Sequence, residues 1–227
     1  MNSKVERFFT FIMKEKTRNI FAFTVYISFI IMFAVSNLPL ALEIICVSTL
    51  MIISLFACTV YLLEWMDKMS EKNSGKLRKN IAQETKKIGK EIVMFIPIWL
   101  ISICVTSFIM IEQPANQTKL VESFYESPIS ELIYMIIIAP IIEEFIFRFL
   151  PYRFIKNKTL YVIVSTVIFA TMHVINDPNA FYYVWFYMIR PLYYGYRYYE
   201  TKDILVTISL HSLNNFISTL PLIISYF

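Results

Sequence analysis

Long apolar runs alternate with short polar stretches along most of the chain. A window of bilayer length predicts helices at about 20–37, 40–63, 91–111, 131–150, 159–175, 180–197 and 203–226. A helix needs about 20 mostly apolar residues to cross the hydrocarbon core of a membrane, and most of these runs approach that length. The pattern therefore predicts an all-α fold, a polytopic membrane helix bundle of about seven transmembrane helices.

Lysine and arginine are concentrated in alternate connections. Residues 64–90 hold eight of them, 151–158 hold three and 197–202 hold two, whereas 37–40 and 176–179 hold none and 112–130 hold only Lys119. Positive residues are retained on the cytoplasmic side, so the asymmetry predicts a cytoplasmic N-terminus and an external C-terminus. We expect a multi-pass integral protein of the cell membrane. The basic stretch 64–90 is either an amphipathic helix on the anionic inner leaflet or a solvated linker.

Composition supports lipid as the solvent of this chain. Hydrophobic residues make up 57% and charged residues only 17%, with three glycines, which excludes a disordered chain or a collagen-like fibre. The net charge of +4 comes from residues that flank apolar runs, so we expect no nucleic-acid partner. The three cysteines lie inside apolar runs and predict neither a disulfide framework nor a metal site.

Charged residues inside a predicted transmembrane helix are candidates for function. The run 131–150 contains Glu143, Glu144 and Arg148. Glu144 and Arg148 are i,i+4 neighbours and can pair, whereas Glu143 points about 100° away and is left free. Pro140 lies three residues before Glu143 and predicts a kink with a hydrated pocket beside the free carboxylate.

The only two histidines, His173 and His211, also lie within predicted helices, and Asn215 follows His211 by one helical turn. One free carboxylate, two imidazoles and a carboxamide are the groups with which a hydrolase activates water and stabilises an oxyanion. No Ser or Cys has a histidine at a spacing typical of a nucleophile. Straight helices would place Glu143 about 10 Å, His211 about 12 Å and His173 about 21 Å from the inner ends, so His173 comes out too deep. Either the helix predicted at 159–175 starts earlier, or it is strongly tilted, or a helix boundary is wrong by a turn.

Three motifs carry a resemblance to a known family. Glu-Glu-x-x-x-Arg at 143–148, Phe-x-x-x-His at 169–173 and His-x-x-x-Asn at 211–215 resemble the motifs of the CPBP intramembrane proteases. These comprise the CAAX prenyl proteases and the bacteriocin-processing or immunity proteins, also called Abi. The resemblance implies a catalytic core of about four spans at 131–227, which follows an N-terminal membrane region of about three spans at 1–130.

The resemblance implies an intramembrane endopeptidase that cuts a small peptide precursor or a membrane-anchored protein. Glu143 and His173 would activate water, and His211 and Asn215 would polarise the scissile carbonyl. Glu144, Arg148 and Phe169 would support these groups. The family often has a glycine where this chain has Phe149, which touches no catalytic group. The family mechanism is metal-independent, so we expect no cofactor; the alternative is zinc held by Glu143, His173 and His211.

Two other functions use the same residues. A non-proteolytic protein of this fold could bind a peptide and confer immunity. A proton-coupled carrier could use the Glu and His side chains as a relay, although no internal repeat supports this. The lysine-rich, glycine-poor composition fits a bacterial origin.

Overall fold

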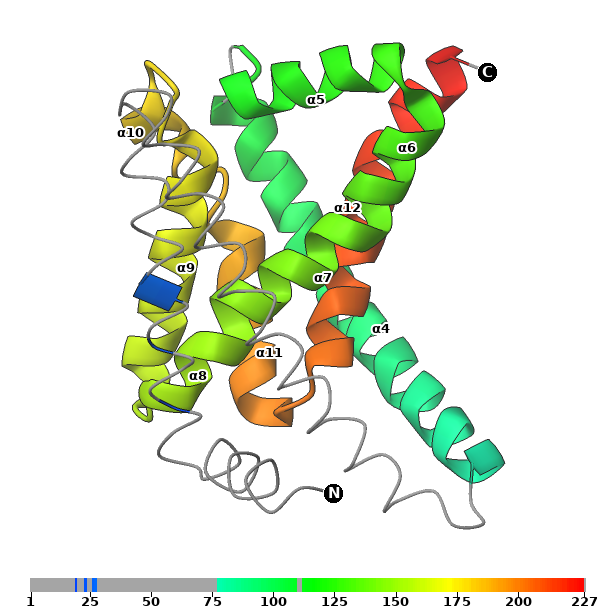
Figure 1. Ribbon diagram of the computed structural model, residues 1–227, viewed down its shortest axis with the longest axis vertical. Coiled ribbons are helices and arrows are strands. Elements are labelled where there is room, and N and C mark those ends of the chain that lie inside the picture. The colour runs from blue at the N-terminus through cyan, green and yellow to red at the C-terminus, as the bar shows by residue number, and fades with distance from the viewer. Residues whose placement is uncertain (1–18, 20–22, 24–25, 28–76, 110–111, 227) are drawn as a thin grey trace, which may run out of the picture. The chain divides into compact units, whose positions relative to one another are not determined.

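The computed structural model describes residues 19, 23, 26, 27, 77–109 and 112–226 of the chain (Figure 1). The predicted helices at 20–37 and 40–63 lie almost entirely outside these residues. The chain divides into two compact units, Met1–Ile81 and Ala82–Phe227. The second unit contains all the candidate site residues.

All the regular structure in the described residues is helical, which confirms the all-α prediction for this part of the chain. Its α-helices are α4 (Leu77–Ile109), α5 (Ala115–Glu126), α6 (Pro128–Ile133), α7 (Ala139–Glu144), α8 (Leu150–Phe154), α9 (Lys158–Val174), α10 (Ala180–Tyr183), α11 (Ile189–Thr201) and α12 (Ile204–Tyr226). Two π-helical segments, η1 (Tyr134–Ile138) and η2 (Phe145–Phe149), join α6, α7 and α8 into one long bent rod.

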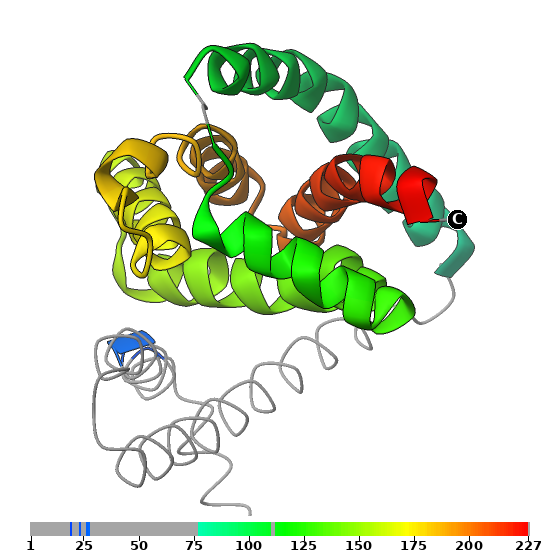
Figure 2. The ribbon, with the colours of Figure 1, turned by 90° about the horizontal axis from the view of Figure 1, so that it is seen from above.

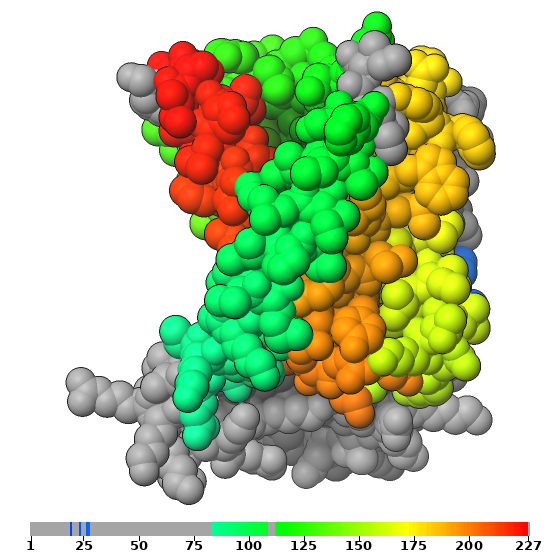
Figure 3. Space-filling model, turned by 180° about the vertical axis from the view of Figure 1, so that it is seen from behind, coloured from blue at the N-terminus to red at the C-terminus, as the bar shows by residue number. Residues whose placement is uncertain are grey.

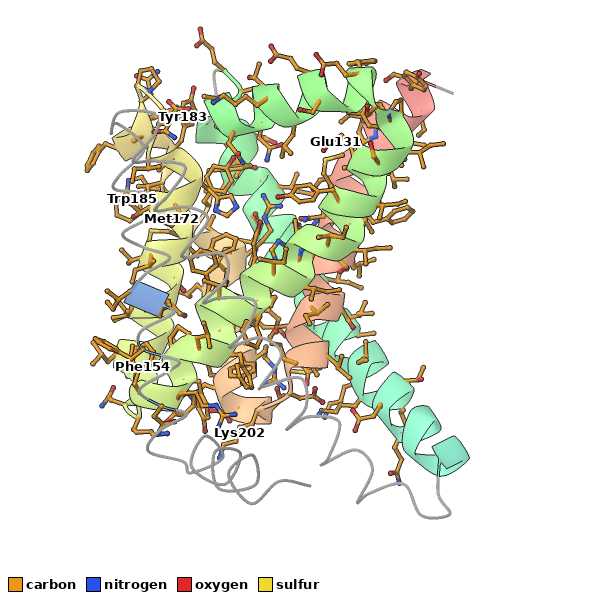
Figure 4. The ribbon with its side chains drawn as sticks, viewed as in Figure 1. Glu131, Phe154, Met172, Tyr183, Trp185 and Lys202 are labelled. Atoms are coloured by element: carbon orange, nitrogen blue, oxygen red, sulfur yellow. The ribbon has the colours of Figure 1, made fainter. Side chains whose placement is uncertain are left out.

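The rod, α9 and α12 run between two opposite ends of this unit (Figure 4). Phe154 and Lys202 mark one end, and Glu131 and Tyr183 mark the other. The basic connections 151–158 and 197–202 thus lie at the same end, as the charge pattern predicts.

One described helix, Gln83–Phe108 within α4, is long and apolar enough to cross a membrane, and the apolar helix Lys158–Val174 is shorter. The rod is divided by its π segments into pieces too short to qualify. In α12, one histidine and two asparagines lower the mean hydropathy. The seven-span arrangement and its orientation stay predictions.

The rod contains π segments because of two prolines. Pro140 and Pro151 are the second residues of α7 and α8, so each lies two residues after the end of a π segment. Proline has no N–H to donate and its ring clashes with the carbonyl four residues earlier, so a wider turn forms there. The rod continues to Phe154, four residues beyond the predicted end at 150. This corrects the boundary by about one turn.

Two further predictions are corrected. The connection predicted at 112–130 contains α5, which begins after Pro114 and lies across the Tyr183 end (Figure 1). Its side chain Phe124 is fully buried, and the Asp177 carboxylate accepts a hydrogen bond of 2.7 Å from the Ala115 N–H. Such a short amphipathic helix escapes a search for bilayer-length runs.

The single helix predicted at 180–197 is broken. It consists of α10, a series of turns at 184–188, and α11, which continues to Thr201. Pro191 lies in the first turn of α11, where its missing N–H is tolerated, but its ring disfavours a helix that continues from the N-terminal side.

The core of the unit joins α4, α11 and α12. Phe95, Tyr194, Val206 and Leu210 form a buried cluster, and Figure 3 shows α4 lying across α11. The Phe95 ring lies 5.5 Å from the rings of both Tyr193 and Tyr194. This packing fixes α11 and α12 beside each other and so fixes the side chains that they supply to the site.

Candidate functional site

Glu143 lies between the two histidines. Its Oε2 atom is 3.7 Å from Nε2 of His173 and 3.7 Å from Nε2 of His211. These distances are too long for direct hydrogen bonds, but they leave each pair close enough for one water molecule to bridge it. The structure thus brings together three residues from α7, α9 and α12 that lie up to 68 positions apart in the sequence.

These three side chains line a cavity of about 750 Å³. The side chain of Glu143 is 24% exposed, that of His173 18% and that of His211 7%, so all three are accessible from the cavity without being on the outer surface. The cavity is also lined by Tyr134, Met135, Phe169, Tyr187, Arg190, Tyr194, Asn214 and Asn215. Viewed from above, the rod, α9, α11, α12 and α4 are arranged around this region (Figure 2).

Glu144 anchors His211 from the side away from the cavity. Its Oε1 atom accepts a hydrogen bond of 2.9 Å from Nδ1 of His211, and its Oε2 atom lies 3.5 Å from Nε of Arg148. Glu144 and Arg148 are both fully buried. The predicted i,i+4 pair is confirmed, and the structure adds that the pair holds an imidazole ring from another helix.

His173 is anchored differently, by its own helix. Its Nδ1 atom lies 2.9 Å from the carbonyl oxygen of Phe169, and the two rings stack with centroids 4.3 Å apart. A carbonyl only accepts hydrogen bonds, so Nδ1 carries the proton, and Nε2 of a neutral His173 presents a lone pair toward Glu143. Phe169 also packs under the Arg148 guanidinium at 4.9 Å and edge-on to His211 at 5.9 Å.

Asn215 joins α12 to the π segment η1. Its amide donates a hydrogen bond of 2.9 Å to the carbonyl oxygen of Met135. The Ala139 N–H bonds to Tyr134, and the next residue along, Pro140, has no N–H, so the rod itself supplies no donor for the Met135 carbonyl. One amide hydrogen of Asn215 thereby forms a hydrogen bond with the Met135 carbonyl, which has no donor within the rod because of Pro140. The second amide hydrogen is not used in this bond.

Three residues in the cavity wall were missed by sequence reasoning. Tyr194 stacks on His211 with ring centroids 5.4 Å apart, and the ring of Tyr187 lies 4.9 Å from that of His173. Arg190 donates a hydrogen bond of 2.7 Å to Oδ1 of Asn214. The signal for Arg190 was available, because an arginine in the middle of a predicted transmembrane run is by itself a candidate for function. The two tyrosines are hidden in a tyrosine-rich stretch and carry no distinct signal.

The described residues contain no group of three or more His, Cys, Asp and Glu side chains that could hold a metal ion as they are placed. The donor types at Glu143, His173 and His211 would nevertheless suit zinc. The metal alternative is therefore a question for experiment.

The fold and the site define a helical protein with a carboxylate and two imidazoles gathered on the wall of one cavity. Residues 125–217 match the sequence model of a family described as type II CAAX prenyl endopeptidase Rce1-like, a family of membrane-associated proteases. The match includes all three motifs and confirms the predicted resemblance over this part of the chain.

The chain is also similar to one bacterial protein of known sequence. The chain is 37% identical over 99 residues to the UPF0177 protein YaiH of Lactococcus lactis subsp. lactis (strain IL1403). The aligned region covers 44% of this chain and 39% of YaiH. No solved structure matches the chain.

Proposed function

We propose that this protein is an intramembrane endopeptidase of the CPBP type that uses water activated by Glu143 and His173. The observation that carries the proposal is the position of the Glu143 carboxylate, 3.7 Å from Nε2 of both histidines at the wall of a cavity. The match of residues 125–217 to a protease family supports it.

The first step is the activation of water. A water molecule between Glu143 and His173 donates one hydrogen to the carboxylate and one to the Nε2 lone pair of His173. As the water oxygen attacks the carbonyl carbon of the substrate, one O–H bond breaks and its proton passes to Glu143. A positioned general base of this kind contributes a factor of about 10²–10⁴ to the rate.

The second step is the stabilisation and collapse of the intermediate. His211 carries a proton on Nδ1, held by Glu144, and a second proton on Nε2 donates to the developing oxyanion. Asn215 supplies its uncommitted amide hydrogen from the next turn of α12. When the C–N bond breaks, the proton held by Glu143 passes to the leaving nitrogen, so the products are a carboxylic acid and an amine and the enzyme is restored.

The substrate class follows from the setting of the site. We propose a small peptide precursor or a membrane-anchored protein, cleaved within a multi-pass protein of the cell membrane. The mechanism uses no metal. A cavity of about 750 Å³ is large enough for several residues of an extended peptide.

The test replaces the Glu143 carboxylate with an uncharged amide of the same shape. We expect Glu143→Gln to abolish the release of peptides, seen when the membrane peptidomes of cells with wild-type and variant protein are compared. Glu122→Gln, on the exposed face of α5, is the matched control and should leave the peptidome unchanged. Full function in the Glu143→Gln variant would contradict the proposal and favour a peptide-binding or immunity protein.

A further inference from the structure

Arg190 places a positive charge in the wall of the catalytic cavity, and no described residue forms an ion pair with it. It lines the same cavity as Glu143, His173 and His211. In the part of the chain that the structure describes, its contacts are a hydrogen bond of 2.7 Å from Nη1 to Oδ1 of Asn214 and the ring of Phe186 at 5.2 Å. Neither contact neutralises the guanidinium.

Two other arginines of this unit, Arg148 and Arg197, are paired with carboxylates. Arg148 lies against Glu144, and Arg197 binds both oxygens of Glu91, with a distance of 2.6 Å from Nε to Oε2. A cation held in a partly buried position without a counter-ion is unfavourable, because burial removes hydration that no carboxylate replaces. An anionic ligand in the cavity would supply the missing charge.

Arg190 binds the helix that carries His211, the proposed oxyanion donor. Asn214, which it binds, follows His211 by three residues on α12, an advance of about 4.5 Å along the helix axis. An extended peptide advances about 3.3–3.6 Å per residue. A carboxylate bound by Arg190 would therefore belong to a residue within about three positions of the scissile bond.

We propose that Arg190 is a specificity-determining residue that binds a carboxylate of the substrate close to the cleaved bond. This inference rests on the proposed function. The carboxylate could be the free C-terminus of the substrate or the side chain of an Asp or Glu. Asn214 holds the guanidinium in place, and the fork of N–H groups on arginine matches the two oxygens of a carboxylate.

The test measures binding separately from cleavage. The probes are three pools of dye-labelled peptides with random uncharged sequences: free acids, C-terminal amides, and amides with one Glu among the last three residues. Binding is measured with full-length Glu143→Gln protein in detergent, so that no probe is consumed. We expect at least one carboxylate pool to bind about tenfold or more tighter than the neutral amides, since hydrogen bonds to charged groups are the stronger ones. Which pool it is identifies the source of the carboxylate.

The substitution Arg190→Gln in the same background should remove this difference and leave binding of the neutral amides unchanged, and Arg190→Lys should restore part of it. Arg153→Gln, at an arginine outside the cavity, is the matched control and should change nothing. Equal binding of all three pools, or a preference that survives Arg190→Gln, would overturn the inference. Cleavage of the same pools by the wild-type protein reports separately on the proposed function.

Discussion

The two histidines share a carboxylate but have different anchors, and the anchors define their roles. Nδ1 of His173 is held by a backbone carbonyl, so a proton sits on Nδ1 and Nε2 is the nitrogen that can accept a hydrogen bond. Nδ1 of His211 is held by the buried carboxylate of Glu144, which fixes the ring with Nε2 toward Glu143. The first arrangement suits a base and the second suits a hydrogen-bond donor.

Substitution of each histidine should therefore have a different effect. We expect His173→Ala to remove nearly all turnover, because Glu143 then lacks the partner with which it activates water. His211→Ala should leave a residual rate, since the loss of one oxyanion donor costs about 3–4 kcal/mol. Single-turnover rates on a cleaved peptide, with thermal unfolding as the check on folding, would measure both. An unchanged rate for His211→Ala would contradict the donor role.

Chelation separates the two chemistries that the same three side chains could support. A water activated by Glu143 and His173 needs no ion, so the purified protein in detergent should keep its activity after prolonged treatment with a strong chelator. A zinc mechanism requires neutral imidazole ligands and would lose activity with the metal. Stoichiometric zinc that leaves with the activity and restores it on return would make Glu143, His173 and His211 the ligands.

At the scale of the helices, a proline in the rod helps to position the side chains of the site. Pro140 lies just after the π segment η1, which ends at Ile138, and leaves the Met135 carbonyl to Asn215. A regular α-helix through these positions would turn Glu143 and Glu144 relative to the rest of the rod, because a π segment holds more residues per turn. The contact between η1 and α12 is therefore part of what places both carboxylates.

A double substitution tests this contact. Asn215→Ala leaves the buried Met135 carbonyl without a donor and should lower the free energy of unfolding by about 1–3 kcal/mol. Adding Pro140→Ala returns a backbone N–H to the rod and should recover much of that loss. Thermal unfolding of the four variants in the cycle gives the coupling. Purely additive effects would show that the carbonyl and the amide are independent.

At the scale of the whole molecule, the sequence predicted contacts between residues one turn apart on the same helix. It did not predict contacts that depend on how the chain folds back on itself. The pairing of Glu144 with Arg148 follows from the i,i+4 rule and is confirmed. Straight helices with the predicted bounds placed His173 too deep, and the structure shows why: the rod continues one turn beyond residue 150 to Phe154 and contains two π segments, and the His173 ring lies beside Glu143. The sequence did not predict α5 or the break before α11. These features depend on a short apolar face and on a proline, and hydropathy averaged over a window of bilayer length does not detect either.

The bond between Glu144 and His211 could not be read from the sequence, because 67 residues separate them and their approach is set by how α12 crosses the rod. The same holds for Arg190 and Asn214, which meet only because α11 and α12 pack side by side. Residue types could be selected from the sequence, whereas the pairing of residues on different helices required the fold.

The arrangement of the chain in the membrane gives the last prediction. The basic connections 151–158 and 197–202 lie at one end of the described unit, and the Lys- and Arg-poor stretches 112–130 and 176–179 belong to the other. Because positive residues are retained in the cytoplasm, a reporter inserted after residue 156 should be cytoplasmic and one inserted after residue 178 should be external. A reporter after residue 75 should be cytoplasmic and one after residue 227 external. Enzymatic reporters that are active on only one side of the membrane would measure all four positions. As a control, replacing Lys156 and Lys158 by Gln reduces the positive charge at this end without changing the cavity. Reporters after 156 and 178 on the same side would mean that α9 does not cross the membrane, and the predicted topology would have to be abandoned.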